Sequence, residues 1–208
     1  MGLSTKRPRW ACQFTWSVRA HQKHAYSVLL QFVYQEIHFY LCGDHAIGFC
    51  AFVWLLFIVL AFLKLERKQF FLFLACALAS IGLADFTASQ IIKEGIQRYR
   101  PSHNLLLNEH LHFYQLSAKE VYLGGQYGFV SNHAANFFAI SSWGAILFWN
   151  EKRWFVYIMF SSAILVGFSR IYLGVHYLSD VIGGAIWGVL ISYLMYRFVY
   201  LKFSKHVK

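Results

Sequence analysis

Residues 46–63 read AIGFCAFVWLLFIVLAFL, an apolar run that contains no charged side chain. A helix needs about 20 mostly apolar residues to cross the hydrocarbon layer of a bilayer. Four later stretches are similar and carry at most one Asp, Glu, Lys or Arg each: residues 70–92, 129–149, 154–168 and 181–200. The sequence therefore predicts an all-α fold, a polytopic membrane helical bundle.

The overall composition agrees with a membrane protein. Apolar residues make up 58% of the chain and charged residues 13%, against roughly 25% charged in ordinary globular proteins. Because so few polar side chains cannot cover the surface, lipid must solvate part of it. The net charge of +10 is gathered in short clusters between apolar runs. We interpret these clusters as topology signals, and we expect the bilayer, and no nucleic acid, as a partner.

Lys and Arg residues also predict how the chain crosses the membrane. Most of them fall in four clusters: residues 1–24, the turn after residue 63, the turn before residue 154 and the C-terminal tail. Residues 26–42 are interrupted by polar side chains and either span the membrane or lie in its interface. If they span, all four clusters lie on one side, which the positive-inside rule makes the cytoplasm.

We therefore favour about six transmembrane helices in a single membrane-embedded domain, residues 1–208, with five helices plus an interfacial helix as the alternative. In the six-helix arrangement the basic segment 1–24 is cytoplasmic. The long loop 102–127 then lies on the opposite face, and a loop of that length in a compact domain is usually functional or mobile.

Three stretches on this non-cytoplasmic side carry unusual polar residues. In the first, Lys93 and Arg100 are seven residues apart and Pro101 follows. Two helical turns separate the two cations, which predicts that they share one helix face, and Pro101 is expected to end that helix. Paired cations at a membrane boundary suit a phosphate group. The alternative is a basic cluster that snorkels to lipid headgroups.

The second stretch, Phe129-Val-Ser-Asn-His133, stands at the start of a predicted span. Ser131 is a natural N-cap residue. Free amide N–H groups and the positive end of the helix dipole attract anions to such a helix start. His133 lies in this first turn, where a lone histidine is more often structural and gains a chemical role only through partners.

The third stretch runs from Ser169 to Asp180 and contains Arg170 and His176. His176 and Asp180 are four residues apart, so on a helix the carboxylate reaches the imidazole. A carboxylate on one ring nitrogen fixes the tautomer and leaves the other nitrogen as a nucleophile. Arg170 adds a guanidinium fork that fits a phosphate. The alternative is a satisfied polar pair between packed helices.

In this order the three stretches resemble the signature of the type 2 phosphatidic acid phosphatase superfamily, K-x6-R-P, P-S-G-H and S-R-x5-H-x3-D. The first and third parts are complete, as Lys93…Arg100-Pro101 and Ser169-Arg170…His176…Asp180. The middle part departs from the signature, because Val130-Ser131-Asn132-His133 lacks its proline and glycine. The resemblance covers residues 70–195, the catalytic signature region. The sequence of residues 127–136 looks like that of short bacterial members of the superfamily.

The resemblance implies phosphoryl transfer without a metal or cofactor. His176 would be the nucleophile that forms a phosphohistidine, Asp180 would orient it, and His133 would act as general acid and base. The residues implied to bind the phosphate oxygens are Lys93, Arg100, Arg170, Ser131 and Asn132, the last through its backbone N–H. Phosphoryl transfer depends mainly on positioning and charge neutralisation, which three fixed cations can supply.

Asn132 raises a separate question, because it stands where the signature has glycine. If the glycine provides a positive φ, asparagine is the next best residue. If it lets phosphate approach the backbone, the added side chain crowds the site.

The resemblance further implies a lipid phosphatase of the bacterial inner membrane whose site faces the periplasm. Lipid A is the preferred substrate, with undecaprenyl diphosphate and phosphatidylglycerophosphate as alternatives. Two other classes of function stay open: an anion or lipid transporter, and a non-catalytic lipid-binding protein. The clustering of polar residues at one boundary argues against a transport pathway, and a His–Asp pair argues against mere binding.

Overall fold

The computed structural model describes residues 44–104, 107, 111 and 122–205. The predicted segments 1–24 and 26–42 lie outside these residues, as does most of the loop 102–127. The chain divides into two compact units, Met1–Phe52 and Val53–Lys208. All predicted site residues belong to the second unit, which is described below.

The elements are helical throughout. They are α2 (Asp44–Lys64), α3 (Arg67–Thr87), α4 (Lys93–Ile96), α5 (Asn132–Phe148), α6 (Arg153–Tyr172), α7 (Leu178–Met195) and α8 (Leu201–Ser204). The π-helical turns Ala88–Ile92 and Tyr196–Tyr200 join α3 to α4 and α7 to α8, and Pro101–His103 forms a 3-10 turn. In the described part of the chain the only extended pairing is one isolated bridge between Tyr99 and Tyr127. The predicted all-α fold is confirmed.

Three of the described helices are long and apolar enough to cross a membrane: Arg67–Ile96, Arg153–Tyr172 and Leu178–Ser204. The apolar segment Phe52–Lys64 is shorter, and α5 has 17 residues. The number of spans therefore stays a prediction. Helix α5 begins at Asn132 with Ser131 as its N-cap. Residues 129–131 of the predicted apolar stretch precede the helix, and the backbone N–H of Ser131 donates to the carbonyl of Asp180 at 2.9 Å, which holds this segment against α7.

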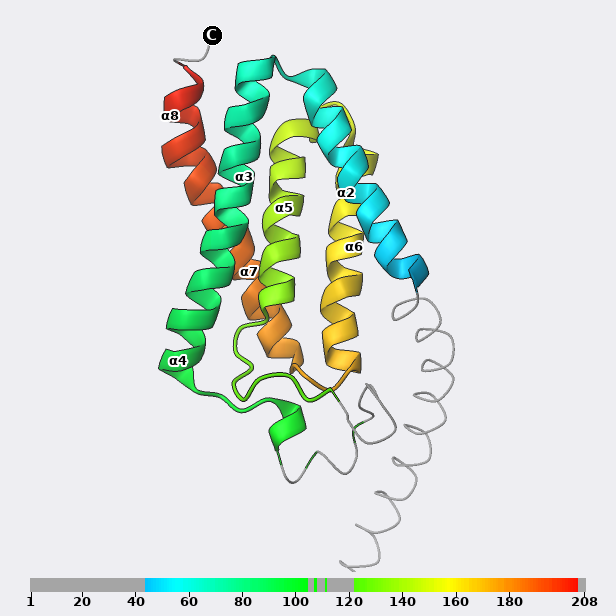
Figure 1. Ribbon diagram of the computed structural model, residues 1–208, viewed down its shortest axis with the longest axis vertical. Coiled ribbons are helices and arrows are strands. Elements are labelled where there is room, and N and C mark those ends of the chain that lie inside the picture. Colours follow the sequence, from blue (N-terminus) through cyan, green and yellow to red (C-terminus); the bar gives the residue numbers. More distant parts are fainter. Residues whose placement is uncertain (1–43, 105–106, 108–110, 112–121, 206–208) are drawn as a thin grey trace, which may run out of the picture. The chain divides into compact units, whose positions relative to one another are not determined.

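Helix α5 lies at the centre of this unit, packed against α3, α6 and α7 (Figure 1). It carries no exposed large hydrophobic side chain, whereas the surrounding helices carry many. Examples that are more than half exposed are Leu55, Phe71, Ile164, Ile186 and Phe198. A bilayer solvates such side chains, and together with the three long apolar helices they define a multi-pass membrane protein.

Small residues let α7 approach α5 closely. A Cβ added to Gly184 would collide with the carbonyl of Ser131, and one added to Gly188 would collide with the carbonyl of Ala135. The two glycines are four residues apart and present one smooth face, the usual pattern of tightly packed membrane helices. This packing fixes the first turn of α5 against the second and third turns of α7.

Aromatic side chains build the core between the helices. Trp143 is fully buried, and its indole N–H donates to Ser80 Oγ at 3.0 Å. Ser80 in turn donates to the carbonyl of Cys76 at 2.7 Å. The rings of Phe73 and Tyr200 pack edge-on against Trp143. Every polar atom in this core must find its partner inside the protein, because lipid offers none.

Basic side chains mark one end of the unit. The α2–α3 turn, the α5–α6 turn and α8 lie at the same end (Figure 1). Lys64 of the first turn forms an ion pair with Glu151 of the second at 2.7 Å and donates to the carbonyl of Leu147 at 2.8 Å. Three of the four basic clusters thus share one end, and the fourth, in residues 1–24, lies outside the described residues.

Candidate active site

The three polar stretches meet at the opposite end of the unit. This end holds α4, the start of α5 and the connection between α6 and α7 (Figure 1). Residues far apart in the sequence contact each other here: Lys93 donates to Asn132, and Arg100 contacts His176. The three stretches come together because the helices run antiparallel, so that α3 and α6 end where α5 and α7 begin.

His176 lies in the connection before α7 and is 3% exposed. Its Nδ1 is 3.4 Å from Oδ2 of Asp180, and its Nε2 is 3.2 Å from Nη1 of Arg100. A guanidinium only donates hydrogen bonds, so the lone pair of Nε2 faces Arg100 and the proton on Nδ1 faces Asp180. This is the tautomer that a nucleophilic Nε2 requires.

His176 and Asp180 contact each other as predicted, but the prediction that they do so as two residues of one helix is wrong. Helix α7 begins at Leu178, so His176 precedes it. The carboxylate folds back over the connection because Asp180 Oδ2 also accepts from the backbone N–H of Tyr177 at 2.9 Å, as in a capping box. The contact therefore comes from the start of the helix and not from two residues on one helical face.

Arg98 holds the other oxygen of Asp180, and sequence reasoning missed it. Its Nη2 lies 2.6 Å from Oδ1 of the fully buried carboxylate and 2.9 Å from Oγ of Ser179. The guanidinium also lies over the ring of Tyr177, 4.6 Å from its centroid. A buried carboxylate is costly unless it is paired. The spacing Arg-x-Arg in residues 98–100 was the only available signal, and only the fold shows that the two guanidinium groups serve different partners.

Burial lowers the pKa of His176 below its ordinary value. The hydrogen bond with Asp180 acts in the opposite direction, while the positive charges of Arg100 and Lys93 lower the pKa further. Desolvation is the largest of these effects, so the imidazole is neutral at neutral pH. A neutral imidazole is the form that can attack phosphorus.

Arg100 reaches the site from an extended segment. Helix α4 ends at Ile96, because Gln97 adopts the left-handed conformation with φ 51°. The backbone of residues 98–100 then pairs with residues 126–128, through Arg100 N to the Gln126 carbonyl at 3.2 Å and Gly128 N to the Arg98 carbonyl at 2.8 Å. The prediction that Lys93 and Arg100 share one helix face, with Pro101 ending that helix, is therefore wrong.

A glycine-rich loop closes around the Arg100 side chain. Arg100 Nε donates to the carbonyl of Tyr127 at 3.1 Å. A Cβ on Gly124, whose φ is 68°, would lie 2.8 Å from Nη1 of Arg100, and a Cβ on Gly128 would lie 3.1 Å from its Cγ. Burial lowers the pKa of Arg100, and the positive charge of Arg170 lowers it further. The charges of Tyr122 and Asp180 raise it. Arg170 is thus electrostatically coupled to Arg100.

The start of α5 supplies the remaining groups. Ser131 occupies the N-cap position as predicted, but its side chain makes no capping bond, and its fully buried Oγ has no hydrogen-bond partner. His133 is exposed on the first turn. The charges of Arg170, His176, Arg100 and Lys93 all act on it. A free hydroxyl, free helix amides and several cations around one histidine suit a bound anion.

The Asn132 side chain turns toward α3. Its Oδ1 accepts from Lys93, and its Nδ2 donates to Asp85 Oδ1 at 2.8 Å and to Ser89 Oγ at 2.6 Å. Because Gln97, not Asn132, is the non-glycine residue with positive φ in the described chain, Asn132 does not need glycine's backbone freedom. Its side chain is engaged in this polar cluster.

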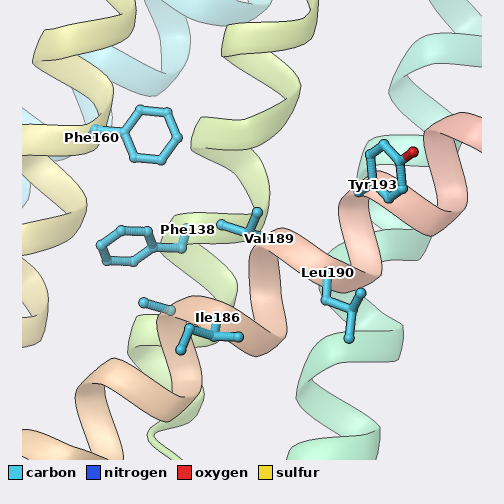
Figure 2. Close-up of a pocket in the computed structure, with 7 residues that line it drawn as sticks. Phe138, Phe160, Ile186, Val189, Leu190 and Tyr193 are labelled. Atoms are coloured by element: carbon cyan, nitrogen blue, oxygen red, sulfur yellow. The ribbon is translucent and has the colours of Figure 1, made fainter.

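An open apolar pocket lies among α5, α6 and α7, further along the helices than the polar site. Figure 2 shows the rings of Phe138 and Phe160 beside Val189 and Ile186. Ala185, Leu190 and Tyr193 complete its lining. Phe138 follows His133 by five residues, which corresponds to about 8 Å along a helix. The apolar pocket thus lies on the membrane side of the polar site.

Together these features define a multi-pass membrane protein with a histidine site at one end that Lys and Arg side chains surround. A family model described as the PAP2 superfamily matches residues 73–204, and the chain belongs to this family. Among the described residues, no group of three or more His, Cys, Asp or Glu side chains could hold a metal ion.

Several known proteins are similar. Lipid A 4'-phosphatase of Porphyromonas gingivalis is 32% identical over 147 residues, which cover 70% of this chain and 58% of the relative. Phosphatidylglycerophosphatase B of Bacillus subtilis is 31% identical over 124 residues, covering 55% and 52%. The chain thus spans little more than half the length of these curated relatives. The crystal structure of a transmembrane PAP2-type phosphatidylglycerolphosphate phosphatase from Bacillus subtilis aligns with a TM-score of 0.47 and 21% identity, covering 92% of this chain and 88% of that one.

Proposed function

We propose that the protein is a membrane lipid phosphatase whose nucleophile is Nε2 of His176. The observation that carries this proposal is the placement of one buried, neutral imidazole between a carboxylate and a guanidinium. Asp180 orients the ring, and Arg100 stands where it can bind the phosphate oxygens beside Nε2. Membership in the PAP2 superfamily supports the same reaction class.

The reaction has two steps. Nε2 of His176 attacks phosphorus, the bond from phosphorus to the lipid oxygen breaks, and His133 gives that oxygen a proton. His133 then takes a proton from water, whose oxygen attacks the phosphohistidine; the P–N bond breaks and inorganic phosphate leaves. Lys93, Arg100 and Arg170 neutralise the non-bridging oxygens, and Ser131 Oγ with the backbone N–H of Asn132 donates to them.

Lipid A is the substrate that we propose first. The Porphyromonas gingivalis relative is named for dephosphorylating it, and the apolar pocket of α5, α6 and α7 offers an acyl chain an apolar surface below the polar site. Phosphatidylglycerophosphate is the second candidate, favoured by the Bacillus subtilis relative. By the positive-inside rule, the end of the unit that carries the basic side chains lies on the cytoplasmic side of the membrane. The site would then face the periplasm from the inner membrane.

A phosphate-release panel tests the proposed function. Purified detergent-solubilised protein is incubated with lipid A, phosphatidylglycerophosphate, undecaprenyl diphosphate and phosphatidic acid, with and without EDTA. We expect release from at least one lipid, no effect of EDTA, and a loss of several orders of magnitude in His176→Ala. Release that EDTA abolishes, or that His176→Ala retains, would overturn the mechanism. Binding without turnover would instead favour a transporter or a lipid-binding protein.

A further inference from the structure

A polar cluster inside the helix bundle links a carboxylate of α3 to the site. Asp85 is half-buried within the span Arg67–Ile96. Its Oδ1 accepts from Nδ2 of Asn132 at 2.8 Å and from Nδ2 of Asn136 at 2.9 Å, both on α5. Charged side chains in membrane spans are costly, so a paired one indicates a specific task.

The cluster continues from Asp85 to Lys93 through Asn132. The amide of Asn132 directs its donor end at Asp85 and Ser89, and its acceptor end at the Lys93 ammonium. Because the two ends of an amide differ, the carboxylate on one side and the ammonium on the other allow only one orientation of the side chain. Asp85, Ser89 and Lys93 follow each other at intervals of four residues, so one side of the α3 region faces Asn132 throughout.

We propose that Asn132 is a positioning residue, which holds the Lys93 ammonium at the phosphate site and is itself anchored by Asp85. An ammonium carries three donors, so its bond to Asn132 leaves donors for phosphate oxygens. The amide does not crowd the phosphate, since it is bonded to Asp85, Ser89 and Lys93. This inference rests on the proposed function in assigning Lys93 to phosphate. It assigns Asp85 and the Asn132 side chain a role in that site.

A double-mutant cycle tests this coupling. Asn132→Gly, Asp85→Leu and the double variant are compared with wild type for kcat and KM on the panel lipid that is turned over fastest. Each single change should lower kcat/KM by at least about tenfold, and the double variant should be no worse than the poorer single one, because both break the same connection. Losses that simply multiply would contradict a shared role.

Asn136→Ala is the matched control. Asn136 donates to the same carboxylate from the same helix, one turn further from Lys93. We expect its kcat/KM to stay within about threefold of wild type, while its unfolding temperature falls because Asp85 loses a hydrogen bond. If both asparagine variants lose activity in proportion to their stability, Asn132 is merely structural and the proposal fails.

Binding of inorganic phosphate separates this inference from the proposed function. Calorimetric titration of purified wild type should show phosphate affinity that Asn132→Gly weakens by at least about fivefold and Asn136→Ala leaves unchanged. Equal affinity in wild type and Asn132→Gly would overturn the positioning role whether or not the protein turns over a lipid. A chain that binds phosphate as expected but releases none from the panel would overturn the proposed function alone.

Discussion

The imidazole of His176 has a defined partner on each nitrogen, and its titration therefore reports on the site. Burial lowers its pKa below the ordinary value of about 6.5. Protonation blocks Nε2, so activity is lost as the pH falls through this lowered pKa, and not at the ordinary histidine value.

We predict that the acidic limb of kcat/KM against pH lies below about pH 6.5. In Asp180→Asn the limb should move to still lower pH, because the hydrogen bond with Asp180 raises the pKa of His176. The rate at the optimum should also fall by roughly ten-thousandfold, since the amide no longer selects the tautomer. A wild-type limb above the ordinary histidine pKa would contradict the assignment of His176 as a buried nucleophile.

Arg98 gives a second prediction at the residue scale. Arg98→Gln removes the ion pair with Asp180 Oδ1 and leaves a buried carboxylate with less compensation. We expect kcat to fall by about tenfold to a hundredfold with little change in KM, because Arg98 contacts Asp180. Arg67→Gln, a change of the same kind at the start of α3, is the control. An unchanged kcat in Arg98→Gln would show that Asp180 needs no such partner.

At the scale of elements, the site depends on how closely α7 approaches α5. Gly188→Ala places a Cβ against the carbonyl of Ala135, and overpacking of this kind costs about 1–3 kcal/mol. We predict a lower unfolding temperature together with reduced activity, because the same packing positions the first turn of α5, which carries His133. Gly82→Ala is the control, as a Cβ there meets nothing within 4 Å. If the two variants unfold at the same temperature, the close packing is not needed.

The sequence predicted these elements better than it predicted their ends. Apolar runs are sufficient to place long helices in a bilayer, so the all-α fold could be predicted. The end of α4 at Gln97 and the extended course to Arg100 depend on pairing with residues 126–128, which local periodicity does not encode. The partners of Arg98 and Asn132 are likewise more than 35 residues away, and only the folded chain brings them together.

At the scale of the whole molecule, the basic end and the histidine end lie at opposite ends of the helices (Figure 1). The positive-inside rule then predicts that the histidine end faces the periplasm. Exposed positions for single cysteines are available at both ends, at Gln126 beside the site and at Asn150 in the α5–α6 turn.

We predict that, with the native cysteines replaced by alanine, a membrane-impermeant maleimide labels Gln126→Cys in intact spheroplasts. Asn150→Cys should be labelled only after the membrane is permeabilised. The reverse pattern would place the site in the cytoplasm and would exclude a substrate confined to the periplasmic leaflet.

The central claim is that Nε2 of His176 forms a bond to phosphorus. The direct measurement is to mix purified protein with the radiolabelled panel lipid, quench in alkali within the first turnover, and locate the label by peptide mass spectrometry. We predict an acid-labile phosphoryl group on His176 that is missing from His176→Ala. A phosphoryl group on any other residue, or phosphate release by His176→Ala at the wild-type rate, would contradict the account.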